Sequence, residues 1–89
     1  MSTFNSSEGE VPNVDLNKME NISSLVTTFE DKDLITRNVL TYYFDKKTDY
    51  VFIDFWSYVN GKPVADNLVG FDKDKVISLC ENIINFFKR

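Results

Sequence analysis

Apolar residues early in the chain recur at three- and four-residue spacing, which predicts a helix. The positions are Leu16, Met19, Ile22, Val26 and Phe29. Asp15 precedes them where an N-cap is expected, so the spacing predicts a short amphipathic helix over roughly 15–25. The stretch from Leu25 to Phe29 is also compatible with a strand, because Val, Thr and Phe favour extended structure.

Three later segments are rich in β-branched and aromatic residues and predict strands over 35–44, 50–59 and 64–71. The charged residues 45–49 separate the first two strands. Asn60-Gly61 separates the last two, and this dipeptide tolerates the positive φ angles of a two-residue hairpin turn. The three strands are therefore expected to form an antiparallel meander.

The last segment of the chain predicts a helix with one apolar side. Asp72 is placed as its N-cap, and Lys88 and Arg89 suit its C-terminal end. Its apolar positions are Val76, Ile77, Leu79, Cys80, Ile83, Ile84, Phe86 and Phe87. The predicted fold class is α+β: a short N-terminal helix, a three-stranded antiparallel β-meander and a C-terminal amphipathic helix packed on the sheet. Residues 1–12 are expected to be a flexible acidic tail, and residues 13–89 a single domain.

The predicted central strand has two different faces. The aliphatic face carries Val51, Ile53, Phe55, Ser57 and Val59, and the aromatic face carries Tyr50, Phe52, Asp54, Trp56 and Tyr58. The aliphatic face is the expected seat of the C-terminal helix. Three interpretations of the aromatic face stay open: the N-terminal helix covers it, two copies bury it in a homodimer, or it is an exposed partner-binding interface formed by Tyr50, Phe52, Trp56 and Tyr58.

Asp54 matters to all three interpretations, because a buried carboxylate without partners is costly. We expect it near a sheet edge, exposed, or paired with Arg37 or a lysine.

Composition excludes several kinds of chemistry. The 89 residues include no histidine and one cysteine, Cys80, so neither a His/Cys metal site nor a Ser-His or Cys-His nucleophile pair can form within one chain. Cys80 falls within an apolar helical stripe, where a packing role is expected. The sequence predicts no catalytic residues, no metal site, no cofactor and no enzymatic activity.

The net charge of −4 is unevenly distributed. Residues 1–36 hold seven acidic and two basic residues (−5), whereas residues 37–89 hold seven acidic and eight basic residues (+1). Direct nucleic-acid binding is not expected from this balance, since it requires Lys and Arg to displace counterions. The sequence has no apolar run long enough for a membrane span and no signal peptide, so no membrane partner and a cytoplasmic location are expected.

Two resemblances suggest functions. The segment from Tyr50-Val-Phe-Ile-Asp-Phe-Trp56 through Val69-Gly-Phe-Asp72 into the last helix resembles the positive cofactor 4 (PC4) type of single-stranded-DNA-binding fold, a β-meander followed by one long helix. That resemblance implies a PC4-like nucleic-acid-binding dimer. The basic residues for backbone contacts are sparse here, with Lys46, Lys47 and Lys62 at the strand turns.

The second resemblance is to small acidic phage-encoded host-takeover proteins, including inhibitors of the nucleoid protein HU, which display carboxylates in place of DNA phosphates. It implies an intracellular binding protein, acting in the host cytoplasm, that inhibits or modulates a basic partner such as a DNA-binding protein. The acidic residues expected to carry the interaction are Glu20, Glu30, Asp31, Asp33, Asp45 and Asp49. An acidic surface attracts a basic one and raises the association rate; the same carboxylates would also keep the domain soluble.

Overall fold

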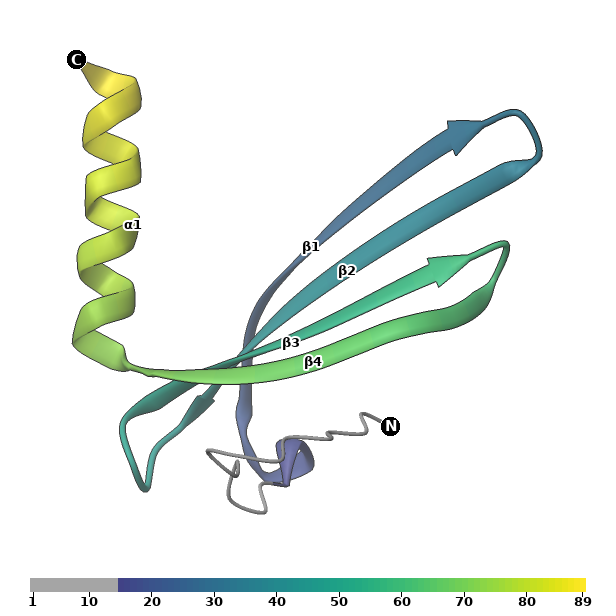
Figure 1. The fold of residues 1–89 in the computed structure, drawn as a ribbon. Helices are drawn as coiled ribbons and strands as arrows, with labels where there is room; N and C mark the ends of the chain where they lie inside the picture. The colour runs from purple at the N-terminus through teal and green to yellow at the C-terminus, as the bar shows by residue number, and fades with distance from the viewer. Residues whose placement is uncertain (1–14) are drawn as a thin grey trace.

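The computed structural model describes residues 15–89, in which one antiparallel sheet is followed by one helix (Figure 1). A 3₁₀ turn, η1 (Leu16–Lys18), leads into four strands: β1 (Glu20–Asp31), β2 (Leu34–Asp45), β3 (Tyr50–Val59) and β4 (Lys62–Asp72). The helix α1 (Lys73–Lys88) follows β4 directly. The strands lie in the order β1-β2-β3-β4, so the α+β class and the antiparallel meander are confirmed with one strand more than predicted. The predicted tail over 1–12 lies outside the described residues.

The predicted N-terminal helix is wrong beyond its first turn. Asp15 does cap η1, with its side chain accepting a hydrogen bond from the amide of Asn17, but β1 begins two residues after η1 ends. β1 pairs with β2 along its whole length, from Glu20 opposite Phe44 to Asp31 opposite Leu34. Its Ser, Thr and Val residues are weak helix formers that suit an extended chain, and the long ladder to β2 overrides the helical spacing of the apolar positions.

The Asn60-Gly61 hairpin is confirmed. Both residues have positive φ, 51° and 83°, as the two-residue turn between β3 and β4 requires. Asn60 also joins this turn to the start of β2: its amide donates to the Ile35 carbonyl at 2.8 Å, and its Oδ1 accepts from the Ile35 amide at 2.9 Å. Two neighbouring hairpins are thereby held together at one end of the sheet.

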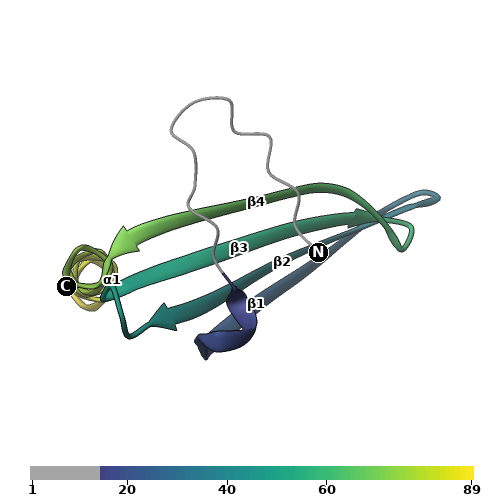
Figure 2. The ribbon, with the colours of Figure 1, turned by 90° about the horizontal axis from the view of Figure 1, so that it is seen from below.

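The base of α1 is fixed at the opposite end of the sheet. Asp72 caps the helix as predicted, with its Oδ1 accepting from the amide of Asp74 at 2.8 Å. The amide of Lys73 donates to the carbonyl of Asp49, in the β2–β3 turn, at 2.9 Å. Beyond this point α1 rises away from the strands (Figure 1), and Figure 2 shows it end-on beside one end of the sheet.

The expectation that α1 packs on the sheet is not met. None of its residues is buried, and Phe87 is 78% exposed. Within residues 15–89 the buried apolar side chains are Val51, Phe52 and Leu68, all on the inner strand β3 or its neighbour β4. The apolar stripe of α1 was correctly identified. Such a stripe predicts that some apolar surface covers the helix but not which one, and the sheet of the same chain does not cover it.

The two faces of β3 alternate as predicted, and the aromatic one contains the buried residues Phe52 and Asp54. Phe52 lies over Gly70 of β4, where a Cβ would fall 2.7 Å from its Cε1 atom. The expectation that Asp54 is exposed or near an edge is wrong: it lies on an inner strand and is 8% exposed. Its Oδ2 accepts a hydrogen bond from the Trp56 indole at 3.3 Å, which helps to offset the cost of burying the carboxylate.

Candidate interaction surfaces

A large apolar groove separates α1 from the aliphatic face. Its volume is about 1080 Å³. From the sheet it is lined by residues of all four strands, including Leu25, Tyr42, Ile53 and Phe71, and from the helix by residues of the apolar stripe. We call this space, between α1 and the aliphatic face, the helix–sheet groove. The aliphatic face is thus the side that α1 faces, as expected, but across an open space.

The groove lining suits apolar contacts rather than chemistry. Its charged residues are Glu20, Lys73, Lys75 and Glu81, two of each sign. Cys80 lies in the same lining with an exposed thiol. Within residues 15–89 no three His, Cys, Asp or Glu side chains are grouped so as to hold a metal ion. An exposed apolar surface of this extent is typical of a site where another macromolecule binds.

The six predicted acidic residues fall into two groups at opposite ends of the sheet. Glu30, Asp31 and Asp33 lie at the tip of the β1–β2 hairpin, around the turn residue Lys32. All four are exposed, and the three carboxylates make no hydrogen bond or ion pair with another described residue. We call these three the acidic tip. Figure 1 shows this hairpin projecting away from the base of α1.

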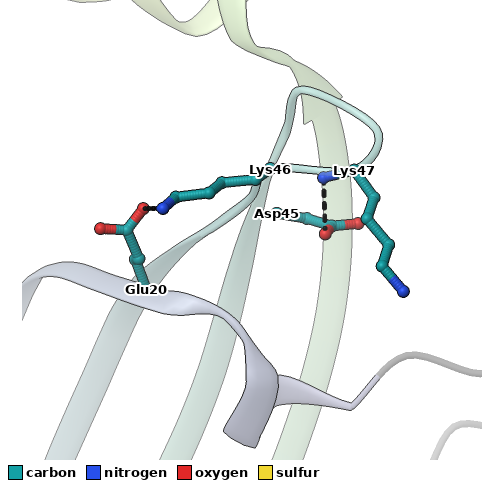
Figure 3. Close-up of polar contacts among 4 residues, drawn as sticks. All are labelled: Glu20, Asp45, Lys46 and Lys47. Carbon is teal, nitrogen blue, oxygen red and sulfur yellow. Dashed lines mark hydrogen bonds and ion pairs between the residues drawn. The ribbon is translucent and has the colours of Figure 1, made fainter.

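Glu20, Asp45 and Asp49 form the second group, close to the β2–β3 turn. Figure 3 shows Glu20 and Asp45 with the neighbouring Lys46 and Lys47. Lys46 Nζ lies 3.6 Å from Glu20 Oε1, and the Asp45 carboxylate accepts from the Lys47 amide and the Thr48 hydroxyl within its own turn. The length of β2 separates the two groups by roughly 36 Å, at 3.3 Å per residue. The structure therefore does not bring the six residues together, and it places lysines beside the second group.

The predicted aromatic interface is partly exposed. Trp56 and Tyr58 are half-buried and stack on each other, with centroids 5.9 Å apart and planes 17° apart. Tyr50 is exposed and sits 6.1 Å from the ring of buried Phe52. Trp56 and Tyr58 belong to the half of β3 that lies toward the acidic tip. The interpretation in which an N-terminal helix covers this face is wrong, because residues 20–31 are a strand of the sheet itself.

Comparisons with protein-family models, curated proteins and solved structures gave no match for this chain. No helix within residues 15–89 is long and apolar enough to cross a membrane.

The helix–sheet groove is the feature that sequence reasoning missed. The apolar stripe of α1 and the aliphatic face were both recognised from the pattern, but they were assigned to each other. The density of large apolar residues in a chain of 89 residues was the available signal, since one small sheet and one helix cannot bury them all.

Proposed function

We propose that this protein is a non-catalytic binding protein that engages a basic partner protein through the acidic tip and thereby inhibits or modulates it. The observation that carries the proposal is the placement of Glu30, Asp31 and Asp33 on a projecting hairpin, with Lys32 as the one cation among them. Carboxylates without local partners keep their full attraction for an approaching basic surface.

The nearby aromatic residues support this assignment. Within the acidic tip, Glu30 lies on the face that carries Trp56 and Tyr58, because it pairs with Ile35, two positions along β2 from Arg37, the partner of Tyr58. Asp31 pairs with Leu34 and lies on the opposite face. Aromatic residues are frequent hot spots at protein interfaces, and a carboxylate on the same face, such as Glu30, favours a basic partner. A DNA-binding protein, whose own surface is basic, is the partner class that fits this combination.

The alternative, single-stranded nucleic-acid binding, finds less support. The aromatic face offers stacking rings, but the backbone of a nucleic acid also needs a path of cations. On this face, β3 and the residues paired with it provide one cation, Arg37. The same residues provide four carboxylates: Asp45, Asp54, Asp66 and Asp72. Phosphates would be repelled by such a surface.

Affinity capture from a cell lysate on immobilised protein, followed by elution in a salt gradient, tests the proposal. Basic proteins are expected to bind at low ionic strength and to elute as salt rises. Charge reversal at Glu30, Asp31 and Asp33 should abolish their retention, and removing residues 1–11 should have a smaller effect. Retention that is indifferent to salt and to these substitutions, or a gel shift with single-stranded DNA at low salt, would overturn the proposal.

A further inference from the structure

Within residues 15–89 nothing covers the apolar side of α1, none of whose residues is buried. The stripe includes Ile83 and Ile84, which remain 48% and 50% exposed although they line the helix–sheet groove. Across the groove, Leu25 and Phe71 of the sheet are also exposed. Exposing two apolar surfaces that face each other across an open space is unfavourable in water.

The described part of the chain has a small core. Its buried apolar side chains are Val51, Phe52 and Leu68, and all three lie in the sheet. Within residues 15–89 no large side chain is fully buried. A second body that fills the groove would supply the missing core.

We propose that the groove is filled by α1 of a second copy of this chain, so that two copies form a symmetric dimer by mutual insertion of their helices. The 1080 Å³ of the groove correspond to roughly nine residues of an α-helix, taken as a cylinder of about 10 Å diameter rising 1.5 Å per residue. That is the length of the stretch Val76–Ile84, which carries most of the apolar stripe. In a dimer with twofold symmetry the same contact between helix and sheet occurs twice, so that both apolar stripes and both aliphatic faces are covered.

The exposed apolar area is sufficient for a stable dimer. Nine large side chains on the two sides of the groove and at the end of α1 are exposed: Ile22, Leu25, Phe71, Ile77, Leu79, Ile83, Ile84, Phe86 and Phe87. At roughly 100 Å² each they present about 900 Å² per copy, or about 1,800 Å² for the pair, which is the size of a standard specific interface.

The charges of the groove also favour α1 as the occupant. The lining holds two acidic and two basic residues, so it does not select a strongly charged ligand. The middle of α1, from Val76 to Ile84, carries Glu81 as its one charge. The acidic tip lies at the far end of the sheet, so this dimer leaves the surface of the proposed function open and does not depend on it.

The mass and the thiol reactivity of the wild-type chain test the proposal together. Sedimentation equilibrium should give twice the 10.3 kDa monomer mass at high concentration and dissociation on dilution, over a series from about 100 µM to about 0.1 µM. Cys80 lines the groove, so its reaction with a small disulfide reagent should be about tenfold slower in the dimer than in the dilute monomer. The proposal would be overturned if the chain has the monomer mass and Cys80 is protected equally at every concentration. That result would show that α1 folds onto its own sheet.

A matched pair of variants locates the interface. Ile83→Asp/Ile84→Asp places two carboxylates in the groove lining, whereas Asn82→Asp/Asn85→Asp places two on α1 residues outside that lining. The first variant should be monomeric with an exposed thiol, and the second should dimerise like the wild type. Equal mass and equal thiol reactivity in the two variants would contradict the assignment. Should the first variant fail to fold, the dilution series of the wild-type chain still decides the question.

Discussion

The Lys73 amide and the Asp49 carbonyl, joined by a 2.9 Å hydrogen bond, set where the helix leaves the sheet. Asp72 caps α1 one residue earlier, so the first turn of the helix is held against the β2–β3 turn while the rest extends beyond it. The width of the helix–sheet groove depends on this anchoring point.

Lys73→Pro removes that hydrogen bond with little other change. Residue 73 is the first residue of α1, where proline is well tolerated, and Asp72 already has the extended backbone (ψ 139°) that a residue before proline needs. We expect unchanged helix content by circular dichroism and a loss of about 1 kcal/mol in the free energy of unfolding, the usual net contribution of one hydrogen bond. Lys73→Ala, which retains the amide, is the control and should unfold like the wild type.

Asn60 is expected to stabilise the fold in two separable ways. Asn60→Ala loses the acceptor for the Ile35 amide. It also puts alanine at a φ of 51°, a left-handed conformation that asparagine adopts more readily than alanine. Asn60→Gly loses only the acceptor. Urea denaturation should show a loss of about 2 kcal/mol for alanine and about 1 kcal/mol for glycine. Equal losses would mean that backbone strain contributes nothing at this position.

Gly70 is expected to be intolerant of any side chain. A Cβ at this position would come within 2.7 Å of Phe52, one of the few buried apolar residues. Gly70→Ala should therefore lower the free energy of unfolding by roughly 1–3 kcal/mol, the usual effect of overpacking. A shorter side chain opposite should relieve the contact, so Gly70→Ala should cost less in a Phe52→Leu background than in the wild type. The same cost in both backgrounds would refute the packing explanation.

The role of the acidic tip in binding can be tested with two variants that change the net charge by the same amount. Asp31→Asn/Asp33→Asn removes two carboxylates from the tip, and Glu20→Gln/Asp49→Asn removes two from the opposite end of the sheet. Against a captured basic partner, the first variant should lower the association rate by tenfold or more and flatten its salt dependence. The second should change the rate by less than about twofold. Similar effects from both variants would point to net charge rather than to a binding surface.

Local signals in the sequence predicted the parts of the fold that depend on neighbouring residues. Asn60-Gly61 specified its turn because few residues adopt two successive positive φ angles, and Asp72 specified the start of α1 because its side chain satisfies an amide of the first turn. The alternative that Leu25–Phe29 is a strand is confirmed, but the first half of β1 was missed. The spacing of Leu16, Met19 and Ile22 fits a helix, while the pairing that makes this half a strand comes from residues up to 24 positions away.

The candidate surfaces were predicted less completely. Residue types identified the carboxylates, but only the strand register separates the tip from Glu20, Asp45 and Asp49. The groove depends on the angle at which α1 leaves β4, and no pattern of apolar residues records that angle. The burial of Asp54 likewise depends on its position in an inner strand beside Trp56.

The most direct test of the dimer is an isotope-filtered nuclear Overhauser experiment on an equimolar mixture of ¹³C-labelled and unlabelled chains at high concentration. If the two copies exchange helices, the methyl groups of Ile83 and Ile84 of one chain should contact those of Leu25 and Ile53 of the other. If these methyl groups contact each other only within the same chain, the dimer is contradicted.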